Sequence, residues 1–333
     1  MTKVKIGMIS FAHSHANSYL QELLVMPEVE IVGIADEERA RVEAVTGNHG
    51  IAYYEDYHAL LAADLDAVII CSENVHHARI TMDAANAGKH VLCEKPLGIT
   101  VSEMRSMIET CERNQVQLMT AFPCRYLPAV IEAKQAIDRG EIGSIIAVKG
   151  TNRGTMPGRW FIDPVLSGGG AILDHTVHVM DLMRWIVRSE PATVYAESGK
   201  LFHDIPVEDA GMVHIQFDSG VVGVIDTSWS RSKSFPFWGD VTMEIIGTEG
   251  VISIDAFAQK NEIYEDDKLK AQWSYWGDRM DSYLVQAFVQ SIAEGHTVPI
   301  TGEDGLQATA VALAAYESMK RKDTIAISEL LEA

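Results

Sequence analysis

The sequence has little positive charge, few cysteines and no long apolar run, and each shortage excludes a class of protein. Its 333 residues include 27 Lys and Arg against 47 Asp and Glu, a formal net charge of −20 at pH 7. Such acidity argues against a surface for nucleic acid or for anionic lipid, because both need basic residues. No apolar run reaches the roughly 18 residues of a membrane-spanning helix, and no secretory leader precedes the first strand-like segment. We therefore expect a cytoplasmic protein with no nucleic-acid or membrane partner.

The four cysteines show no spacing that is typical of a zinc site or of a disulfide framework. Cys71, Cys93, Cys111 and Cys124 form no CxxC pair. Cys71 and Cys93 lie in or beside apolar strand-like runs, which indicates small core residues in a reducing compartment. We expect no resident metal.

Before residue 121, short apolar segments alternate with helical ones. The segments predicted as strands are residues 3–9, 29–35, 51–53, 67–71, 90–93 and 117–120. Because they are apolar along their whole length and helices separate them, they indicate a parallel sheet covered on both faces. We predict an α/β protein whose residues 1–123 form a doubly wound Rossmann domain that binds a dinucleotide.

After Pro123 the pattern changes to strands that follow one another without helical crossovers. They are residues 144–151, 192–200, 210–217, 220–230, 241–247 and 250–256, and turn signals such as Asp218-Ser-Gly220 separate them. This pattern predicts a second, α+β domain over residues 124–333 with an open, mostly antiparallel sheet. Helices are expected at 127–139, 171–187, 279–294 and 303–319, and it stays open whether the last one packs back on the first domain.

Three glycines, Gly168–Gly170, lead into the helix predicted over 171–187. Asp174, His178 and Asp181 follow at spacings of four and three, which places them on one face of that helix. A carboxylate beside an imidazole is typical of a site that handles protons. The alternative is an amphipathic helix whose polar face meets water, and the helix alone does not decide between the two.

The carboxyl ends of the predicted parallel strands are the expected place for a nucleotide. Asp36 ends the second strand, where a carboxylate accepts hydrogen bonds from an adenosine ribose and repels a 2′-phosphate. This favours NAD, while the nearby Arg39 and Arg41 leave NADP possible. The usual G-x-G-x-x-G after the first strand is replaced by Ser10-Phe-Ala-His-Ser-His15. The turn is therefore expected to hold the pyrophosphate with backbone amides at the helix start, or His13 and His15 are half of a metal site.

Two motifs carry a resemblance to a known family. Ala85-Asn-Ala-Gly88-Lys-His-Val-Leu-Cys-Glu-Lys95-Pro-Leu resembles the "AGKHVxxEKPL" motif of the Gfo/Idh/MocA oxidoreductases, and Gly168–Asp181 resembles their second motif. Arg125 and Gly140-Glu-Ile-Gly143 also match. The resemblance covers nearly the whole chain and implies an NAD(P)-dependent oxidoreductase acting on a sugar, polyol or related compound. It also implies a homo-oligomer, a dimer or tetramer, assembled through the C-terminal sheet.

The resemblance also implies the roles of individual residues. Lys95, Asp174 and His178 correspond to the usual catalytic group of the family, and Asp181 is left with a supporting role. The residues expected to bind the cofactor are Ser10, Phe11, Ala12, His13, His15, Asp36, Ser72, Glu73, Asn74, His76, Glu94, Lys95 and Pro96. The residues expected to bind the substrate are Lys95, Arg125, Arg153, Trp160, Asp174, His175 and His178. Two departures from the family pattern are the missing glycines and Ser72-Glu73-Asn74, where "TPN" is common.

The expected reaction moves a hydride between a nicotinamide and a hydroxyl-bearing carbon. His178 would take the hydroxyl proton, Lys95 would stabilise the alkoxide, and Asp174 would orient them, although Lys95 could itself be the proton acceptor. Three alternatives stay open. One is an NAD-dependent reaction without net redox change, such as glycoside cleavage through transient oxidation. Another is a nucleotide-sensing protein without catalysis. The third is a metal-dependent hydrolase or isomerase using His13, His15, His76, His77, His175 and His178.

Overall fold

The computed structural model describes residues 3–275 and 279–332, which form two compact units. Unit 1 comprises Met1–Pro123 and Asp281–Leu306, and unit 2 comprises Cys124–Met280 and Gln307–Ala333. The division after Pro123 coincides with the domain boundary expected from the sequence. Asp281–Leu306 groups with unit 1, whereas the sequence placed everything after residue 123 in one domain. Among the described residues, no helix is both long enough and apolar enough to cross a membrane.

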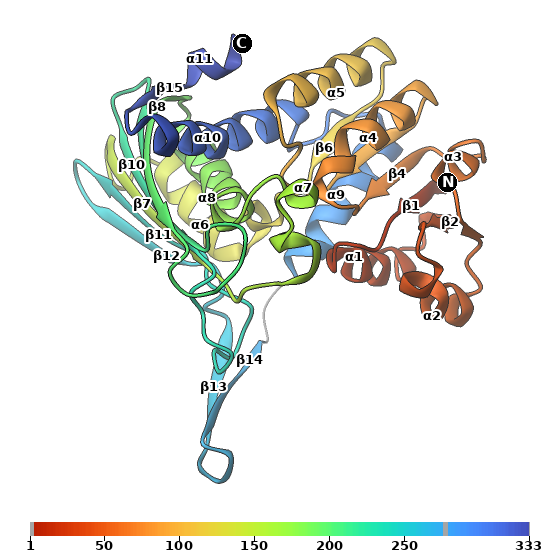
Figure 1. The fold of residues 1–333 in the computed structure, drawn as a ribbon, viewed down its shortest axis with the longest axis horizontal. Helices are drawn as coiled ribbons and strands as arrows, with labels where there is room; N and C mark the ends of the chain where they lie inside the picture. Colours follow the sequence, from red (N-terminus) through yellow and green to blue (C-terminus); the bar gives the residue numbers. More distant parts are fainter. Residues whose placement is uncertain (1–2, 276–278, 333) are drawn as a thin grey trace. The chain divides into compact units, whose positions relative to one another are not determined.

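Unit 1 contains a parallel sheet of six strands in the order β3-β2-β1-β4-β5-β6 (Figure 1). Its strands are β1 (Val4–Ile9), β2 (Val29–Ala35), β3 (Tyr53–Tyr54), β4 (Ala67–Ile70), β5 (His90–Cys93) and β6 (Leu118–Thr120). Its longer helices are α1 (His15–Leu24), α2 (Arg39–His49), α4 (His77–Asn86), α5 (Val101–Arg113) and α9 (Met280–Glu294), with the short α3 (Tyr57–Leu61) between β3 and β4. The predicted Rossmann topology is confirmed.

The strand order of unit 1 determines where a ligand can bind. The chain runs outward from β1 to β3 and then returns to start again at β4 on the other side of β1. A crevice opens at such a switch point, outside the carboxyl ends of the two strands. All four residues of β4 are buried, because helices cover both faces of the sheet. Polar side chains that follow these strands are therefore held on a rigid support.

Unit 2 contains a sheet of seven strands in the order β12-β11-β7-β10-β9-β8-β15. Its strands are β7 (Ile145–Arg153), β8 (Pro191–Gly199), β9 (Ala210–Phe217), β10 (Val222–Ser228), β11 (Thr242–Gly247), β12 (Val251–Asp255) and β15 (Ile325–Ala326). Only β7 and β10 pair in parallel; the other neighbours are antiparallel. The predicted mostly antiparallel sheet is thus confirmed. A further hairpin, β13 (Lys260–Glu265) and β14 (Lys270–Tyr275), was not predicted.

The helix α8 (Ala171–Val187) packs on one face of the seven-stranded sheet. Two glycines of the sheet allow this close approach. A Cβ added at Gly150 would collide with Val179, and one added at Gly211 would lie 2.7 Å from Ile172. The remaining helices of unit 2 are α6 (Pro128–Asp138), α7 (Pro164–Ser167), most of α10 (Gly302–Arg321) and α11 (Ile327–Leu331). The helix that carries the second motif is therefore fixed along its length against the sheet.

Candidate functional site

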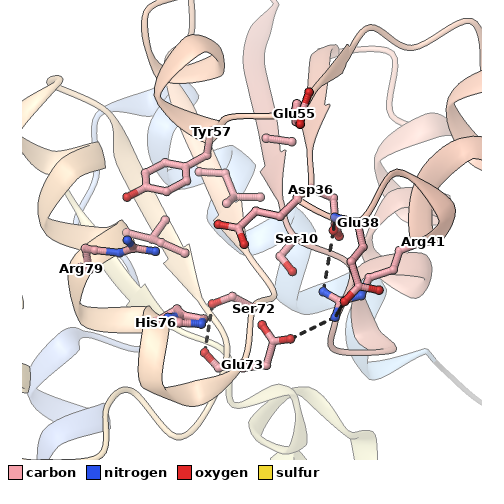
Figure 2. Close-up of a pocket in the computed structure, with 14 residues that line it drawn as sticks. Ser10, Asp36, Glu38, Arg41, Glu55, Tyr57, Ser72, Glu73, His76 and Arg79 are labelled. Carbon is pink, nitrogen blue, oxygen red and sulfur yellow. Dashed lines mark hydrogen bonds and ion pairs between the residues drawn. The ribbon is translucent and has the colours of Figure 1, made fainter. Parts of the chain in front are cut away.

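A pocket lies in unit 1 at the carboxyl ends of β1, β2 and β4 (Figure 2). Five of the residues expected to bind the cofactor line it: Ser10, Asp36, Ser72, Glu73 and His76. The sequence did not single out its other charged and aromatic lining residues, which are Glu37, Glu38, Glu55, Tyr57 and Arg79. Tyr57 and Arg79 come from α3 and α4, and their contribution depends on how these helices dock. The pocket occupies the place where a dinucleotide fold holds the adenosine half of its cofactor.

Asp36 is the best-fixed carboxylate of this pocket. Its Oδ2 accepts from the Phe11 amide at 2.7 Å, and its Oδ1 accepts from the Glu38 amide at 2.8 Å. Burial raises the pKa of Asp36, while these two amides act in the opposite direction. Carboxylate oxygens can each accept a further bond, so Asp36 still suits a ribose hydroxyl. The acceptors of the pocket thus fit the ribose of an adenosine.

Arg41, which left NADP possible, is surrounded by carboxylates. Its guanidinium lies 2.7 Å from Glu38, 3.2 Å from Glu73 and 3.7 Å from Asp36. A 2′-phosphate would have to compete with these three groups for the same cation. The arrangement therefore favours NAD over NADP.

The turn after β1 has an unusual construction. Ser10 has a positive φ of 66°, and its Oγ accepts from the Ala12 amide at 3.2 Å. The His13 amide donates to the Cys71 carbonyl at 2.9 Å, and the His15 amide donates to His13 Nδ1 at 3.2 Å. Together with the bond from Phe11 to Asp36, these contacts use amides that a glycine-rich turn would present to a phosphate. Few backbone amides of this turn therefore remain to bind a pyrophosphate, although the sequence led us to expect them to do so.

His15, Tyr19 and Glu94 form a buried network beside this turn. His15 Nδ1 lies 2.9 Å from Glu94 Oε1, and the Tyr19 hydroxyl donates to the same oxygen at 2.5 Å. Burial opposes the charged form of both His15 and Glu94. Their mutual attraction outweighs it, so the pKa of His15 is raised and that of Glu94 is held well below its usual range. His13 also lowers the pKa of Glu94. Its ring centroid lies 4.3 Å from that of His15.

The turn after β5 holds Lys95, the first member of the expected catalytic group. Lys95 is 5% exposed, its amide donates to Glu94 Oε2 at 3.1 Å, and the Lys95–Pro96 peptide is cis. The fully buried His77 links this turn to the one after β4. Its Nδ1 lies 2.9 Å from the Pro96 carbonyl and its Nε2 lies 3.2 Å from that of Ser72. The sequence considered His77 only as a metal ligand and missed this supporting role.

In unit 2, α8 carries Asp174, His178 and Asp181, and the prediction of a helix over 171–187 is confirmed. The alternative that its polar face meets water is wrong. His178 is 6% exposed and Asp181 is 0% exposed. Asp181 binds the buried Arg125 through two bonds, at 2.8 Å to Nε and 2.5 Å to Nη2. Arg125 is thus held by Asp181, and its expected contact with substrate stays a prediction.

Asp174 lies beside two ring nitrogens, and that of Trp229 donates to it. Its Oδ2 accepts from Trp229 Nε1 at 3.1 Å and lies 3.3 Å from His175 Nε2. His175 Nδ1 lies 2.9 Å from the carbonyl of Asn152, which can only accept, so this nitrogen carries a proton. His175 is therefore held beside Asp174 by its bond to Asn152, and its expected substrate contact stays a prediction. Trp229 was missed because it lies 55 residues away in the chain.

The N-terminus of α8 is held by a carboxylate that the sequence did not indicate. Glu208 Oε1 accepts from the amides of Gly170 and Ile172 at 2.9 and 3.1 Å, and from the Tyr316 hydroxyl at 2.7 Å. Burial raises the pKa of Glu208, against the effect of these donors. A carboxylate at this end complements the helix dipole. The glycine loop is thus anchored by a residue before β9 and another from α10.

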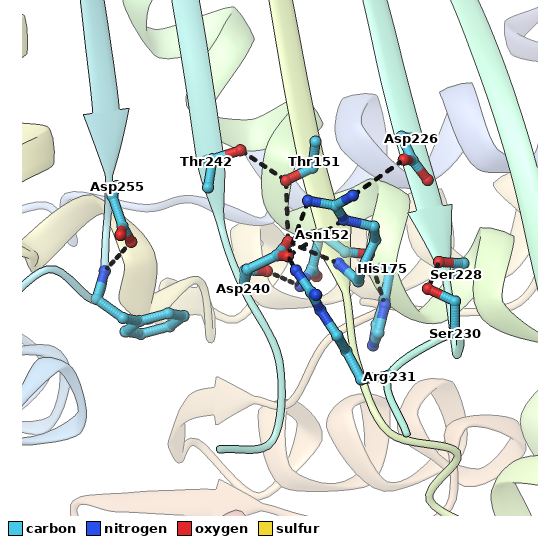
Figure 3. Close-up of polar contacts among 12 residues, drawn as sticks. Thr151, Asn152, His175, Asp226, Ser228, Ser230, Arg231, Asp240, Thr242 and Asp255 are labelled. Atoms are coloured by element: carbon cyan, nitrogen blue, oxygen red, sulfur yellow. Dashed lines mark hydrogen bonds and ion pairs between the residues drawn. The ribbon is translucent and has the colours of Figure 1, made fainter. Parts of the chain in front are cut away.

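Two further residues were expected to bind the substrate. Arg153 is the last residue of β7, and Trp160 lies in the segment that follows this strand. Arg153 contacts Asp240 at 3.1 Å and Asp226 at 3.9 Å. Arg231 binds the same Asp240 (Figure 3). Trp160 is 8% exposed and stacks on Phe161 with ring centroids 3.9 Å apart. Arg153 thus takes part in a network among strand ends. The expected contacts of Arg153 and Trp160 with a substrate stay predictions.

The expected residues are divided between the two units. The cofactor residues and Lys95 belong to unit 1, and Asp174, His178 and the other substrate residues belong to unit 2. Within unit 1, one pocket is lined by Ser10, Asp36, Ser72, Glu73 and His76. Their grouping follows from the fold and not from their spacing in the sequence. The joint role of Lys95, Asp174 and His178 stays a prediction.

Comparisons with known proteins agree with the fold. Residues 4–122 match the model of an oxidoreductase family with an NAD-binding Rossmann fold, and residues 130–253 match that of the GFO/IDH/MocA C-terminal domain. The uncharacterized oxidoreductase YrbE of Bacillus subtilis is 30% identical over 96% of this chain and 95% of its own length. The myo-inositol 2-dehydrogenase of Thermotoga maritima is 28% identical over 98% of this chain and 100% of its own. The crystal structure of a probable dehydrogenase from Thermotoga maritima aligns with a TM-score of 0.84 and 27% identity, covering 98% of this chain and 100% of its own.

Proposed function

Since this chain belongs to the GFO/IDH/MocA oxidoreductase family, with its NAD-binding Rossmann fold, we propose that it oxidises or reduces one carbon of a sugar or polyol. Cyclic polyols are the first class to test, because a relative of full length is a myo-inositol 2-dehydrogenase. The observation that carries the proposal is the pair Asp174 and His178 on α8. They lie one helical turn apart, His178 is buried, and the Trp229 indole donates to the Asp174 carboxylate.

The protein's part in such a reaction is to handle the proton and the developing charge. A bound nicotinamide supplies or accepts the hydride. His178 takes the proton of the substrate hydroxyl during oxidation and returns it during reduction. Lys95 places an ammonium against the negative charge on that oxygen. Asp174 keeps the orientation of these groups, since its own carboxylate accepts a bond from the Trp229 indole. Asp36 and the pocket around it hold the adenosine half of the cofactor.

The test removes the two proton-handling side chains one at a time. Lys95→Ala and His178→Ala should each bind NADH and lose about 10²- to 10⁴-fold in kcat, the usual contribution of a positioned acid–base group. Turnover is followed by NADH absorbance with NAD and a panel of inositols, other polyols and sugars. Matched controls are Lys320→Ala and His296→Ala, whose side chains are 78% and 70% exposed. Near wild-type rates in both site variants would contradict the assignment, and failure to bind either nucleotide would contradict the proposal itself.

We also propose that the chain assembles as a homo-oligomer through the open face of its seven-stranded sheet. Four apolar residues are neighbours across this face, because Val222 pairs with Ala147, Ala147 with Ile246, and Ile246 with Val251. Val222 and Val251 are 49% and 55% exposed. A row of this kind is typical of an interface. Light scattering after gel filtration should show a dimer or tetramer, and Val222→Glu should reduce its mass to that of a monomer.

We also propose that the protein is located in the cytoplasm. All four cysteines are buried thiols outside any disulfide, which supports a reducing compartment.

A further inference from the structure

Three side chains of unit 1 present metal-ligating atoms to one another. Ligand atoms of His13, His15 and Glu94 all lie within 4.8 Å of each other. His13 is 4% exposed and Glu94 is 1% exposed. His13 lies in the turn after β1, His15 is the first residue of α1, and Glu94 follows β5, so the set forms at the carboxyl edge of one sheet. We propose that His13, His15 and Glu94 bind one divalent transition-metal ion.

The donor set selects the class of metal. Two imidazoles and one carboxylate suit Zn²⁺ and its neighbours in the first transition row, whereas Mg²⁺ and Ca²⁺ prefer oxygen ligands alone. The distance of 2.9 Å between His15 Nδ1 and Glu94 Oε1 is compatible with such an ion. Two ligands that each lie about 2.1 Å from a metal are about 3.4 Å apart in a tetrahedral site and about 3 Å apart when they meet the metal at a right angle. The ion can therefore replace the direct bond between these two side chains without a large movement.

The surroundings of the cluster hold its ligands in place. Tyr19 donates to Glu94 Oε1 at 2.5 Å, and the Lys95 amide donates to Glu94 Oε2 at 3.1 Å. The His13 amide is tied to the Cys71 carbonyl at 2.9 Å, so the backbone of the turn is anchored to the strand edge. Contacts of this kind, made by groups behind the ligands, orient a metal site and tune its affinity. The cluster is thus supported on both the turn side and the β5 side.

The position of the cluster indicates a role for the ion, which is to supply positive charge. Amides of the turn are bonded within the protein, and the pocket next to it is rich in carboxylates. The side chain of His15 is 28% exposed, which leaves an open side where an oxygen atom can complete the coordination. A cation here would supply positive charge beside Lys95, in the region where the glycine-rich turn of other dinucleotide folds meets a phosphate.

This proposal departs from the expectation of no resident metal. The sequence suggested His13 and His15 as half of a metal site, or a wider set with His76, His77, His175 and His178, and Glu94 belonged to neither. Glu94 is separated from His15 by 79 residues, and no spacing rule connects them. The proposal is independent of the oxidoreductase activity, because metal binding can be measured without any substrate.

The experiment is a metal titration of the full-length chain, purified without a histidine tag and treated with a chelator. Binding is measured at pH 8, where protons compete less for the imidazoles. Co²⁺ is followed by its visible absorption and displaced by Zn²⁺, and the bound metal is counted by elemental analysis. The variants are His15→Ala, Glu94→Gln and Tyr19→Phe. The matched control is His49→Ala, which removes an exposed histidine at the end of α2.

The expected result is one equivalent of Co²⁺ that Zn²⁺ displaces, with binding kept in His49→Ala. Tyr19→Phe should weaken binding by about 10- to 100-fold, the usual effect of losing a group behind a ligand. His15→Ala and Glu94→Gln should weaken it further. The proposal is overturned if the wild type binds no stoichiometric ion. It is also overturned if all variants that keep the wild-type circular dichroism bind as His49→Ala does.

Discussion

Replacement of Glu208 by alanine tests whether the start of α8 depends on one carboxylate. The change removes the acceptor of the Ile172 amide and of the Tyr316 hydroxyl, and one of the two acceptors of the Gly170 amide, which keeps the Tyr316 hydroxyl at 3.1 Å. A buried donor left without a partner costs about 1–3 kcal/mol. Water entering the space left by the side chain would satisfy part of this demand. We therefore expect a loss of about 3 kcal/mol in the free energy of unfolding of unit 2.

The assay uses a property of the sequence. All six tryptophans lie between residues 160 and 276, so their fluorescence in urea reports on unit 2. Glu208→Gln keeps an oxygen at the same place and should recover most of the lost stability. Glu244→Ala is the matched control, because it removes only a partly exposed ion pair with Lys149, a type worth about 0–1 kcal/mol. A Glu208→Ala protein within 1 kcal/mol of the wild type would refute the reasoning, as would equal losses in Glu208→Ala and Glu208→Gln.

Three further predictions concern other carboxylates. Asp36→Ala should raise the dissociation constant of NADH by about 10- to 100-fold, the effect of losing charged hydrogen bonds, and an unchanged value in a fluorescence titration would contradict the assignment. Trp229→Phe removes the indole donor of Asp174, so kcat should fall about tenfold with little change in KM, and a change in KM alone would point to a different role. Although burial opposes it, the amides of residues 201–203 lower the pKa of Asp209 below its ordinary 3.8. Its contribution to stability is therefore present above that ordinary value and lost as the pH falls through the lowered pKa. Asp209→Asn should be less stable than the wild type at pH 7, and urea melts should show the difference shrinking below pH 4.

The sequence predicted best what depends on short stretches of chain. Apolar runs located β2, β5 and β9 at the observed residues, and the spacing of apolar residues located α8. The hairpin of β13 and β14 escaped prediction because its first strand is mostly exposed and polar, so no apolar face marks it. Secondary structure is predicted from the local pattern of apolar residues, and this pattern is clear in α8 and absent from the hairpin.

The supporting residues of the site could not be predicted, because their partners lie far away in the sequence. Glu208 and Tyr316 meet at the start of α8 from positions 108 residues apart. Tyr19 reaches Glu94 across 75 residues, and neither belongs to a pattern that includes the other. A sequence motif contains the residues that act on a ligand in many related chains. It does not contain the residues whose contacts orient them in one particular chain. Such contacts follow only from the folded arrangement.

The acidic lining of the pocket has a consequence for the speed of cofactor capture. Five carboxylates face this space, from Asp36, Glu37, Glu38, Glu55 and Glu73, against the guanidiniums of Arg41 and Arg79. A dinucleotide is itself an anion, so the field at the entrance slows its approach. Salt screens that field over a Debye length of about 10 Å at 0.1 M. The association rate of NADH should therefore increase with ionic strength, the reverse of what is seen when an enzyme steers its ligand electrostatically.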